Sequence, residues 1–253
     1  MIPQAQSIDE VIVILKNIIA ENKNEASPLA YFAVLYCRVT EKVKEGIEQG
    51  IFQDNPRMEK LDVVFANRYI EAYYTYKNAG SPSACWEVAF KESNNYWLIV
   101  LQHLLLGMNA HINLDLGIAA AQVCPKEAIH GLESDFNKIN EILASLVGNA
   151  EKALSDIWPT LKWILTKTQN VDNFLLDFSM QTAREGAWKF ALKLAPLDAN
   201  SFEKAVKERD LSVTEITKII TNQNIFVQAI LKFIRLFERG TVDQKIALLE
   251  ETI

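Results

Sequence analysis

The stretch from Leu98 to Ala121 constrains the fold more than any other part of the chain. It is long enough to cross a bilayer as a helix. It nevertheless carries six polar side chains, each costly in hydrocarbon: Gln102, His103, Asn109, His111, Asn113 and Asp115. We therefore expect a helix buried in a soluble protein, not in a membrane protein. Every polar group needs a partner there, because an unsatisfied buried one costs about 1–3 kcal/mol.

The rest of the chain also carries the sequence signals of helices. Gly and Pro number only 9 and 7 in 253 residues, below the average usage of about 7% and 5%. Capping boxes, in which Ser or Thr caps a helix and Glu or Gln reaches back, lie at Ser7–Glu10, Ser212–Glu215 and Thr241–Gln244. No segment alternates apolar and polar residues between hairpin turns, so no strand is predicted.

Proline and glycine sit mostly at the expected helix boundaries. The expected helices cover residues 7–19, 28–49, 56–78, 83–93, 96–106, 132–157, 171–194, 212–239 and 242–253. The stretch 196–211 is the one candidate for an internal boundary. We predict a single all-α domain over residues 1–253, a multi-helix bundle of roughly ten helices with no sheet. Residues 197–253 are expected to form a C-terminal helical extension packed on it.

Charge and cysteine content exclude several classes of protein. The net charge of −6 argues against nucleic-acid binding, which needs a basic surface to contact phosphates. Cys37, Cys85 and Cys124 form no CxxC pair, so we expect buried free thiols in a reducing compartment. The N-terminus lacks the basic region and cleavage site of a signal peptide. A cytoplasmic protein is predicted.

The central stretch holds two of the three histidines at helical spacing from an aspartate. In a helix, His103, Gly107, His111 and Asp115 form a slowly twisting stripe, since each step of four residues advances about 40°. Two imidazoles and a carboxylate match the ligands of iron, manganese or zinc. Asp62 on another helix would complete a divalent metal site, with Glu71 and Glu87 as spare ligands. However, nearly 12 Å of helical rise separates the two histidines, so one ion binds both only if the helix breaks between them.

The same residues form a candidate catalytic site without a metal. Catalytic roles are predicted for His103, His111, Asp115 and Arg184, with Arg184 holding an anionic group or pairing with Asp62 or Asp115. Trp188 lies four residues after Arg184, so the indole and guanidinium can stack. The predicted pocket residues are Asp62, Tyr69, Gln102, Asn109, Asn113 and Trp188.

A purely structural interpretation of these residues stays open. Asp115 would then N-cap a short helix over residues 116–124, and His103 would be a satisfied core histidine. Asn109 and Asn113 would bond free carbonyls where the longer helix ends. Arg184 would be a partly buried cation paired with a core carboxylate, and the tyrosines around Tyr69 would be packing residues.

Other chemical motifs are weak or absent. Glu127 and His130 have the ExxH spacing of di-iron bundles, but those sites need a second such motif; a solvated helix start is favoured instead. The chain has no GxGxxG, GxxxxGK[ST], HExxH or GxSxG motif. No nucleotide cofactor is therefore expected.

The central stretch resembles the hallmark of an uncharacterised, largely bacterial family, domain of unknown function 5995. The string runs from Gln102 to Gly117, and further resemblance extends over roughly residues 28–195. Its other matching positions include Tyr31, Phe32, Tyr36, Thr40, Phe52, Met58, Asp62, Phe65, Ala66, Tyr69, Ala72, Trp86, Ala183, Arg184, Ala187 and Trp188. The resemblance implies an all-α fold and brings no established activity.

Two functions follow from the residues. In the first, a buried pocket of His, Asp, Asn and Arg binds a small molecule or forms a metal-dependent enzyme. In the second, the protein is a non-catalytic interaction or scaffold protein, and the polar cluster only fixes helix packing. The two differ in whether the side chains converge on a cavity or saturate one another.

Overall fold

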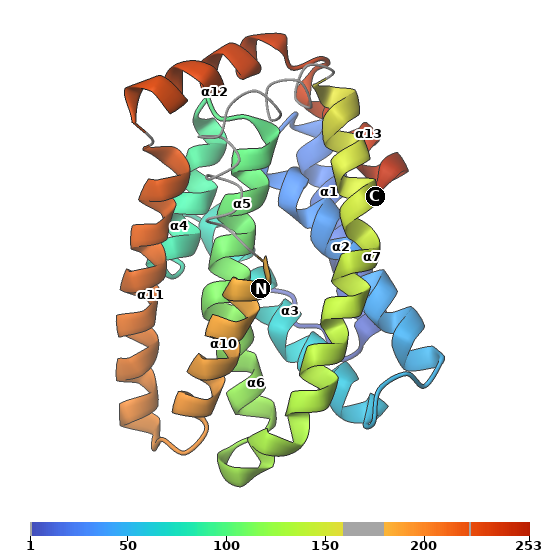
Figure 1. Cartoon of the computed structure of the whole chain (residues 1–253), viewed down its shortest axis with the longest axis vertical. Helices are drawn as coiled ribbons and strands as arrows, with labels where there is room; N and C mark the ends of the chain where they lie inside the picture. The colour runs from blue at the N-terminus through green and yellow to red at the C-terminus, as the bar shows by residue number, and fades with distance from the viewer. Residues whose placement is uncertain (1, 159–179, 223) are drawn as a thin grey trace.

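The computed structural model describes residues 2–158, 180–222 and 224–253 (Figure 1). The α-helices in them are α1 (Ile8–Asn24), α2 (Leu29–Glu48), α3 (Asn55–Lys77), α4 (Ala84–Lys91), α5 (Val100–Ala110), α6 (Gly117–Val123), α7 (Glu133–Ile157), α10 (Met180–Leu194), α11 (Ala199–Thr221), α12 (Ile225–Phe237) and α13 (Val242–Thr252). None of these described residues lies in a strand. The predicted all-α bundle without a sheet is confirmed. Residues 171–179 of the helix expected over 171–194 lie outside the described residues.

The apolar stretch forms one continuous helical rod. α5 passes into a π-helical turn, His111–Leu116, and then into α6. Figure 1 shows this rod between α10 and α11 on one side and α2 and α7 on the other. The segment Val100–Val123 is long and apolar enough to cross a membrane, but 89% of its most apolar window is buried inside the protein. The predicted burial is confirmed. The expected helix end near Leu106 is wrong, as is the alternative in which Asp115 N-caps a separate helix, because the rod does not break there.

Gly107 lets α2 approach the middle of this rod. A Cβ atom at Gly107 would lie 2.4 Å from Cγ of Phe32, far inside van der Waals contact. The Phe32 ring takes that space and packs edge-on against His111, with 5.6 Å between ring centroids. Glycine therefore sets the distance between α2 and α5, on which the position of His111 relative to α2 depends.

Two of the three predicted capping boxes begin helices. Ser7 Oγ accepts a hydrogen bond from the amide of Glu10, and Gln244 Oε1 accepts one from the amide of Thr241. The box at Ser212–Glu215 is wrong, because α11 runs through it and Ser212 Oγ bonds the carbonyl of Glu208. Asp198 caps α11 instead; α11 ends at Thr221, and α12 begins at Ile225.

The C-terminal helices are attached by carboxylates that cap helices of the N-terminal part. Asp210 of α11 accepts hydrogen bonds from the amides of Ala84 and Cys85 at the start of α4. Glu238, after α12, accepts one from the amide of Val100 at the start of α5. A carboxylate at a helix N-terminus is stabilised by the free amides and the helix dipole. That residues 197–253 form an extension of a single domain stays a prediction.

The core agrees with the cysteine analysis. Cys37, Cys85 and Cys124 are all buried free thiols. The buried apolar side chains form one cluster that runs from Ala5 in the N-terminal segment to Ile253 at the C-terminus.

We predict that Gly107→Ala lowers the free energy of unfolding by about 1–3 kcal/mol, because the new methyl group overlaps Phe32. Urea denaturation measures the change. Gly186→Ala on α10 is the matched control. Its Cβ would meet only the end of the Arg209 side chain at 3.5 Å, so helix propensity should leave stability equal or about 0.5–1 kcal/mol higher. Equal losses in both variants would contradict the close approach.

Candidate functional site

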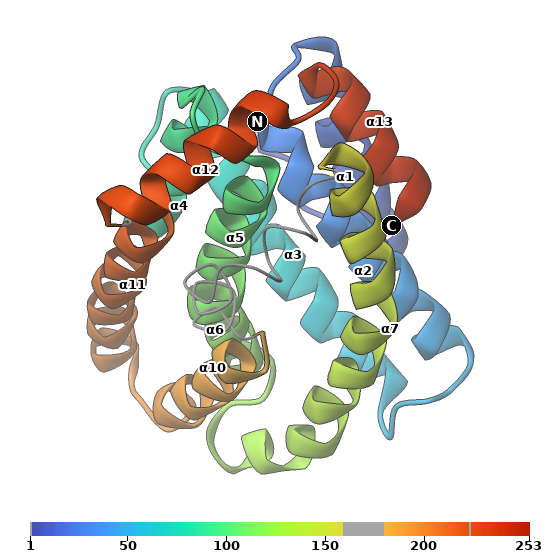
Figure 2. The same ribbon diagram turned by 45° about the horizontal axis from the view of Figure 1, so that its top comes forward.

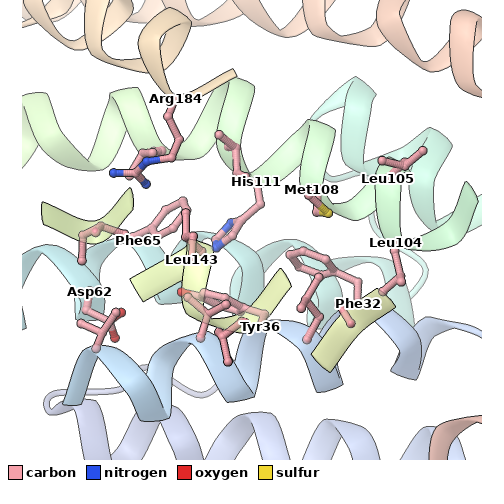
Figure 3. Close-up of a pocket in the computed structure, with 18 of the residues that line it drawn as sticks. Phe32, Tyr36, Asp62, Phe65, Leu104, Leu105, Met108, His111, Leu143 and Arg184 are labelled. Carbon is pink, nitrogen blue, oxygen red and sulfur yellow. The ribbon is translucent and has the colours of Figure 1, made fainter. Parts of the chain in front are cut away.

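A cavity of about 250 Å³ lies beside the rod, between α2, α3, α5, α7 and α10 (Figure 3). Its walls are almost wholly aliphatic and aromatic, and include Phe32, Leu35, Val39, Met58, Leu61, Phe65, Leu101, Leu104, Leu105, Met108, Phe136, Ile139, Leu143 and Leu146. Among the described residues that line it, four are polar: Tyr36, Asp62, His111 and Arg184. The sequence predicted three of these four as site residues.

Asp115 orients His111 from within the rod. The two residues flank one turn of the π-helical segment, and His111 Nδ1 lies 3.4 Å from Asp115 Oδ2. Asp115 Oδ1 also accepts a hydrogen bond from Arg68 Nε at 2.8 Å, and Oδ2 accepts one from Trp86 Nε1 at 2.7 Å. One buried carboxylate thereby joins α3, α4 and the rod.

The charge state of Asp115 fixes the tautomer of His111. Burial raises the pKa of Asp115, but Arg68 and the hydrogen bonds from His111 and Trp86 outweigh it and hold the pKa below its usual value. Asp115 is therefore ionised and accepts the Nδ1 proton of His111. Burial lowers the pKa of His111, although Asp115 opposes the shift. The imidazole is neutral at pH 7, and its Nε2 lone pair is free to accept a proton or a hydrogen bond.

Three buried polar atoms at this cavity lack a hydrogen-bond partner among the described residues: His111 Nε2, Tyr36 Oη and Asp62 Oδ2. The Tyr36 and His111 rings meet edge to face with 4.3 Å between centroids, and Phe65 stacks on the imidazole at 3.6 Å. Figure 3 shows the His111 ring projecting from its helix towards Tyr36. Such orphaned groups are rare in folded proteins and mark places where a ligand or water completes the bonding.

Burial keeps Tyr36 and Asp62 uncharged. It raises the pKa of Asp62 to about 8, with a smaller contribution from Glu59. It also raises the pKa of Tyr36 well above the usual value. At neutral pH both groups are hydrogen-bond donors, so they complement an acceptor atom rather than a cation.

Arg184 is a buried cation at the same cavity, only 6% exposed. Its Nε donates to Asn140 Oδ1 at 2.6 Å and its Nη2 to the Phe136 carbonyl, and the guanidinium lies over the Phe136 ring. No carboxylate among the described residues pairs with it, so the predicted pairing with Asp62 or Asp115 is wrong. The guanidinium was predicted to stack on Trp188. It lies over the Phe136 ring instead, and Trp188 packs against that ring. Burial lowers the pKa of Arg184 to about 10, which leaves it charged at pH 7.

The other predicted pocket residues serve helix packing. Gln102 Nε2 donates to the Ile220 carbonyl, and Gln102 Oε1 accepts from the amide of Ile99. Asn109 Nδ2 donates to the Val213 carbonyl, and Asn109 Oδ1 accepts from Asn113 Nδ2. Gln102 and Asn109 thus fasten α11 to the rod. The structural alternative expected Asn109 and Asn113 to bond free carbonyls at the end of a helix, and this expectation is wrong.

His103 and Tyr69 do not line the cavity that contains His111. They line a separate space of about 20 Å³ with Trp86 and Gly107. Burial lowers the pKa of His103 to about 3, helped by Arg235 and Lys245, and its ring packs on Tyr31 at 5.8 Å. His103 is a neutral core histidine, as the structural alternative expected.

The predicted metal ligands do not come together. The rod is unbroken between His103 and His111, and the two imidazoles line different spaces. In the part of the chain that the structure describes, no three His, Cys, Asp or Glu side chains are grouped to hold an ion. Asp115 is moreover already bonded to Arg68, Trp86 and His111.

The remaining acidic candidates are at the surface. Glu71 is exposed, and Glu87 pairs with Lys91. The ExxH pair belongs to a 3₁₀ turn, Lys126–Leu132. Its side chains are 98% and 65% exposed for Glu127 and His130, which agrees with a solvated helix start.

Sequence reasoning missed Tyr36 and Phe65 as site residues. Both lie on the apolar faces of their helices, where an aromatic side chain is usually packing. They are nevertheless among the positions that carry the family resemblance. A polar hydroxyl on an otherwise apolar face of α2 was the available signal for Tyr36.

Comparison with protein families matches residues 8–223 to a family of unknown function, DUF5995. Neither the curated proteins nor the solved structures gave a match.

We predict that Asp62→Asn removes a pH dependence of stability. Because the folded pKa of Asp62 is raised to about 8, the wild type keeps its full stability below about pH 4 and loses it as the pH rises towards 8. The stability of the variant relative to wild type should therefore grow between pH 5 and 8, at up to about 1.4 kcal/mol per pH unit. Urea denaturation at several pH values measures this. Glu71→Gln, on the exposed side of the same helix, should leave the slope unchanged; parallel curves for Asp62→Asn would refute the buried neutral acid.

Proposed function

The chain belongs to the DUF5995 family, which has no assigned activity, and we propose from the cavity that it binds a single-chain amphiphile with an anionic head, such as a medium-chain fatty acid. The apolar chain would lie along the Leu, Phe and Met side chains, and the carboxylate would meet Arg184. A volume of about 250 Å³ is slightly smaller than that of most ligand pockets, which begin at about 300 Å³. It suits a slender ligand rather than a bulky cofactor.

The buried charge of Arg184, with which no carboxylate of the described residues pairs, is the observation that carries this proposal. Removing an ion from water costs several kcal/mol even after relaxation. Its two neutral acceptors, Asn140 and the Phe136 carbonyl, compensate only part of that cost. A carboxylate would supply the missing opposite charge through the paired N–H groups of the guanidinium, for which arginine is the preferred residue.

The other polar groups favour the same ligand. Tyr36 and neutral Asp62 offer donors, and none of the described residues that line the cavity is a carboxylate ionised at pH 7 that would repel an anion. Figure 3 shows Arg184 and Asp62 towards one end of the cavity and Leu104 and Leu105 towards the other. An amphiphile has this division between head and chain.

The scaffold alternative applies to a different set of residues. Gln102, Asn109, Asn113 and Asp115 saturate one another or neighbouring helices. They therefore account for packing without a ligand. The packing explanation leaves Arg184 and the three orphaned atoms without a role, and the ligand gives them one.

We predict that the delipidated protein binds laurate at least tenfold more tightly than dodecanol in isothermal titration calorimetry. Arg184→Gln should remove this preference, a loss of at least about 1.4 kcal/mol. Ala150→Phe, which fills the cavity from α7, should weaken both ligands.

Arg209→Gln is the matched control. Arg209 also lies over a phenyl ring, that of Phe190, and donates to a backbone carbonyl, that of Asn113. It does not line the cavity beside His111 but a separate, more open hollow, so laurate affinity should stay within about twofold, or about 0.4 kcal/mol. Absence of saturable laurate binding, or equal losses in both arginine variants, would refute the proposal.

A catalytic role for the same site is favoured by the Asp115–His111 pair. A carboxylate that orients one imidazole nitrogen and leaves the other free towards a cavity is the arrangement of a general base. His111 Nε2 would then accept the proton of a hydroxyl-bearing ligand as its O–H bond breaks, while Arg184 holds the anionic head.

We predict that ¹⁵N NMR of the imidazoles shows His111 as the Nδ1–H tautomer at pH 7, with a shift of Nε2 when laurate is added. The chain has 3 histidines, and the spectrum of His111→Gln assigns the signal. An Nε2–H tautomer, or a protonated ring at pH 7, would exclude the general base.

A further inference from the structure

α12 presents an apolar face that the described protein does not cover. The helix buries Val227, Leu231 and Ile234 against the body. On its opposite side the large side chains are more than half exposed, and Ile225 reaches 88%. This α12 face consists of Ile225, Phe226, Phe233, Leu236 and Phe237. A surface helix normally turns charged and polar residues to solvent, so the α12 face needs an explanation.

Two aromatic residues from a different part of the chain extend the α12 face. Tyr96 and Trp97, in the loop before α5, are also exposed. Arg235 of α12 donates from Nε to the Tyr96 carbonyl at 2.7 Å and lies over the Tyr96 ring. Lys232 Nζ lies over the Trp97 ring at 5.6 Å. The loop and the helix therefore form one surface.

This surface is at an outer end of the molecule. In Figures 1 and 2, α12 crosses the same end of the bundle, between α11 and α13.

The charge of α12 is opposite to that of the whole chain. The chain carries −6, yet Lys232 and Arg235 are the charged residues between Ile225 and Phe237, and both are basic. Glu238, directly after α12, is turned inward and bonds Val100, Arg235 and Lys245. The charge displayed beside the α12 face is therefore positive.

We infer that the α12 face, with Tyr96 and Trp97, docks the protein on an anionic lipid surface, with α12 lying in the plane of the interface. Phe, Ile and Leu would enter the acyl boundary, as in interfacial helices. Trp97 and Tyr96 would lie at the level of the headgroups, where these two residue types are enriched. Lys232 would meet the anionic lipid, which attracts basic residues near the surface.

Composition distinguishes this partner from a second protein. A protein interface of this kind carries a polar rim with paired hydrogen bonds. Here the outward side of α12 between Ile225 and Phe237 offers apolar side chains and Lys232. This inference rests on the surface alone and does not depend on what the cavity binds.

Co-sedimentation with vesicles tests it. The full chain should bind vesicles of mixed phosphatidylglycerol and phosphatidylcholine, and bind pure phosphatidylcholine at least fivefold more weakly. The triple variant Phe226→Ser, Phe233→Ser, Phe237→Ser should lose at least tenfold in binding to the mixed vesicles. Lys232→Gln should lose about fivefold, the effect of one basic residue near an anionic surface.

The double variant Val13→Ser, Leu211→Ser is the matched control, since both side chains are exposed apolar residues outside α12. It should bind within twofold of wild type. Circular dichroism and thermal melting check that each variant folds. Absence of binding to the mixed vesicles, equal binding to both vesicle types, or equal losses in the triple variant and the control would overturn the inference. A dimer in light scattering that the triple variant dissociates, without vesicle binding, would assign the face to a second copy instead.

Discussion

The structure depends on the buried carboxylate of Asp115. Its two oxygens accept hydrogen bonds from Arg68 on α3 and Trp86 on α4, and one of them meets His111 on the rod. Removing the Asp115 carboxylate would leave the Arg68 cation and the Trp86 N–H donor unsatisfied, and removing Arg68 would leave the carboxylate as an unpaired buried ion. Both changes are costly in a medium of low polarity. The position of α3 and α4 along the rod is therefore fixed by electrostatics as well as by packing. The same bonds hold His111 in one orientation beside the cavity.

The polar residues of the core divide into two groups by whether their bonds are complete. Gln102, Asn109 and Asn113 are satisfied by α11 and by each other, and they hold helices together. The second group lies at an apolar cavity: among the described residues, Tyr36, Asp62 and His111 each keep a side-chain atom without a hydrogen-bond partner, and Arg184 has no carboxylate beside it. Natural proteins rarely leave such groups without a purpose, because each lowers stability. Together with the α12 face, this gives the protein one apolar surface between its helices and one on its exterior.

Most of the fold and about half of the site follow from the sequence. Capping residues and apolar spacing located the helices because those signals act over one or two turns. They failed at Ser212, where burial of Val213 and Thr217 against neighbouring helices outweighed a local capping pattern. The polar cluster around His111 was predicted from composition. Its division between a cavity and a packing network was not, because that depends on which helix faces which. Tyr36 of α2 and the α7 side chains line the same cavity as His111 only because of tertiary packing.

The π-helical turn between Ala110 and Gly117 makes the length of this segment as important as its residues. Such a turn holds one more residue than the α-helical turn it replaces. Deleting one of the residues 112–114 would let this turn close as a regular α-helical turn, but it would leave His111 and Asp115 three residues apart instead of four. The contact between His111 Nδ1 and Asp115 Oδ2 depends on the present spacing. Members of the family should therefore differ in side chains along this segment more readily than in the number of residues between His111 and Asp115.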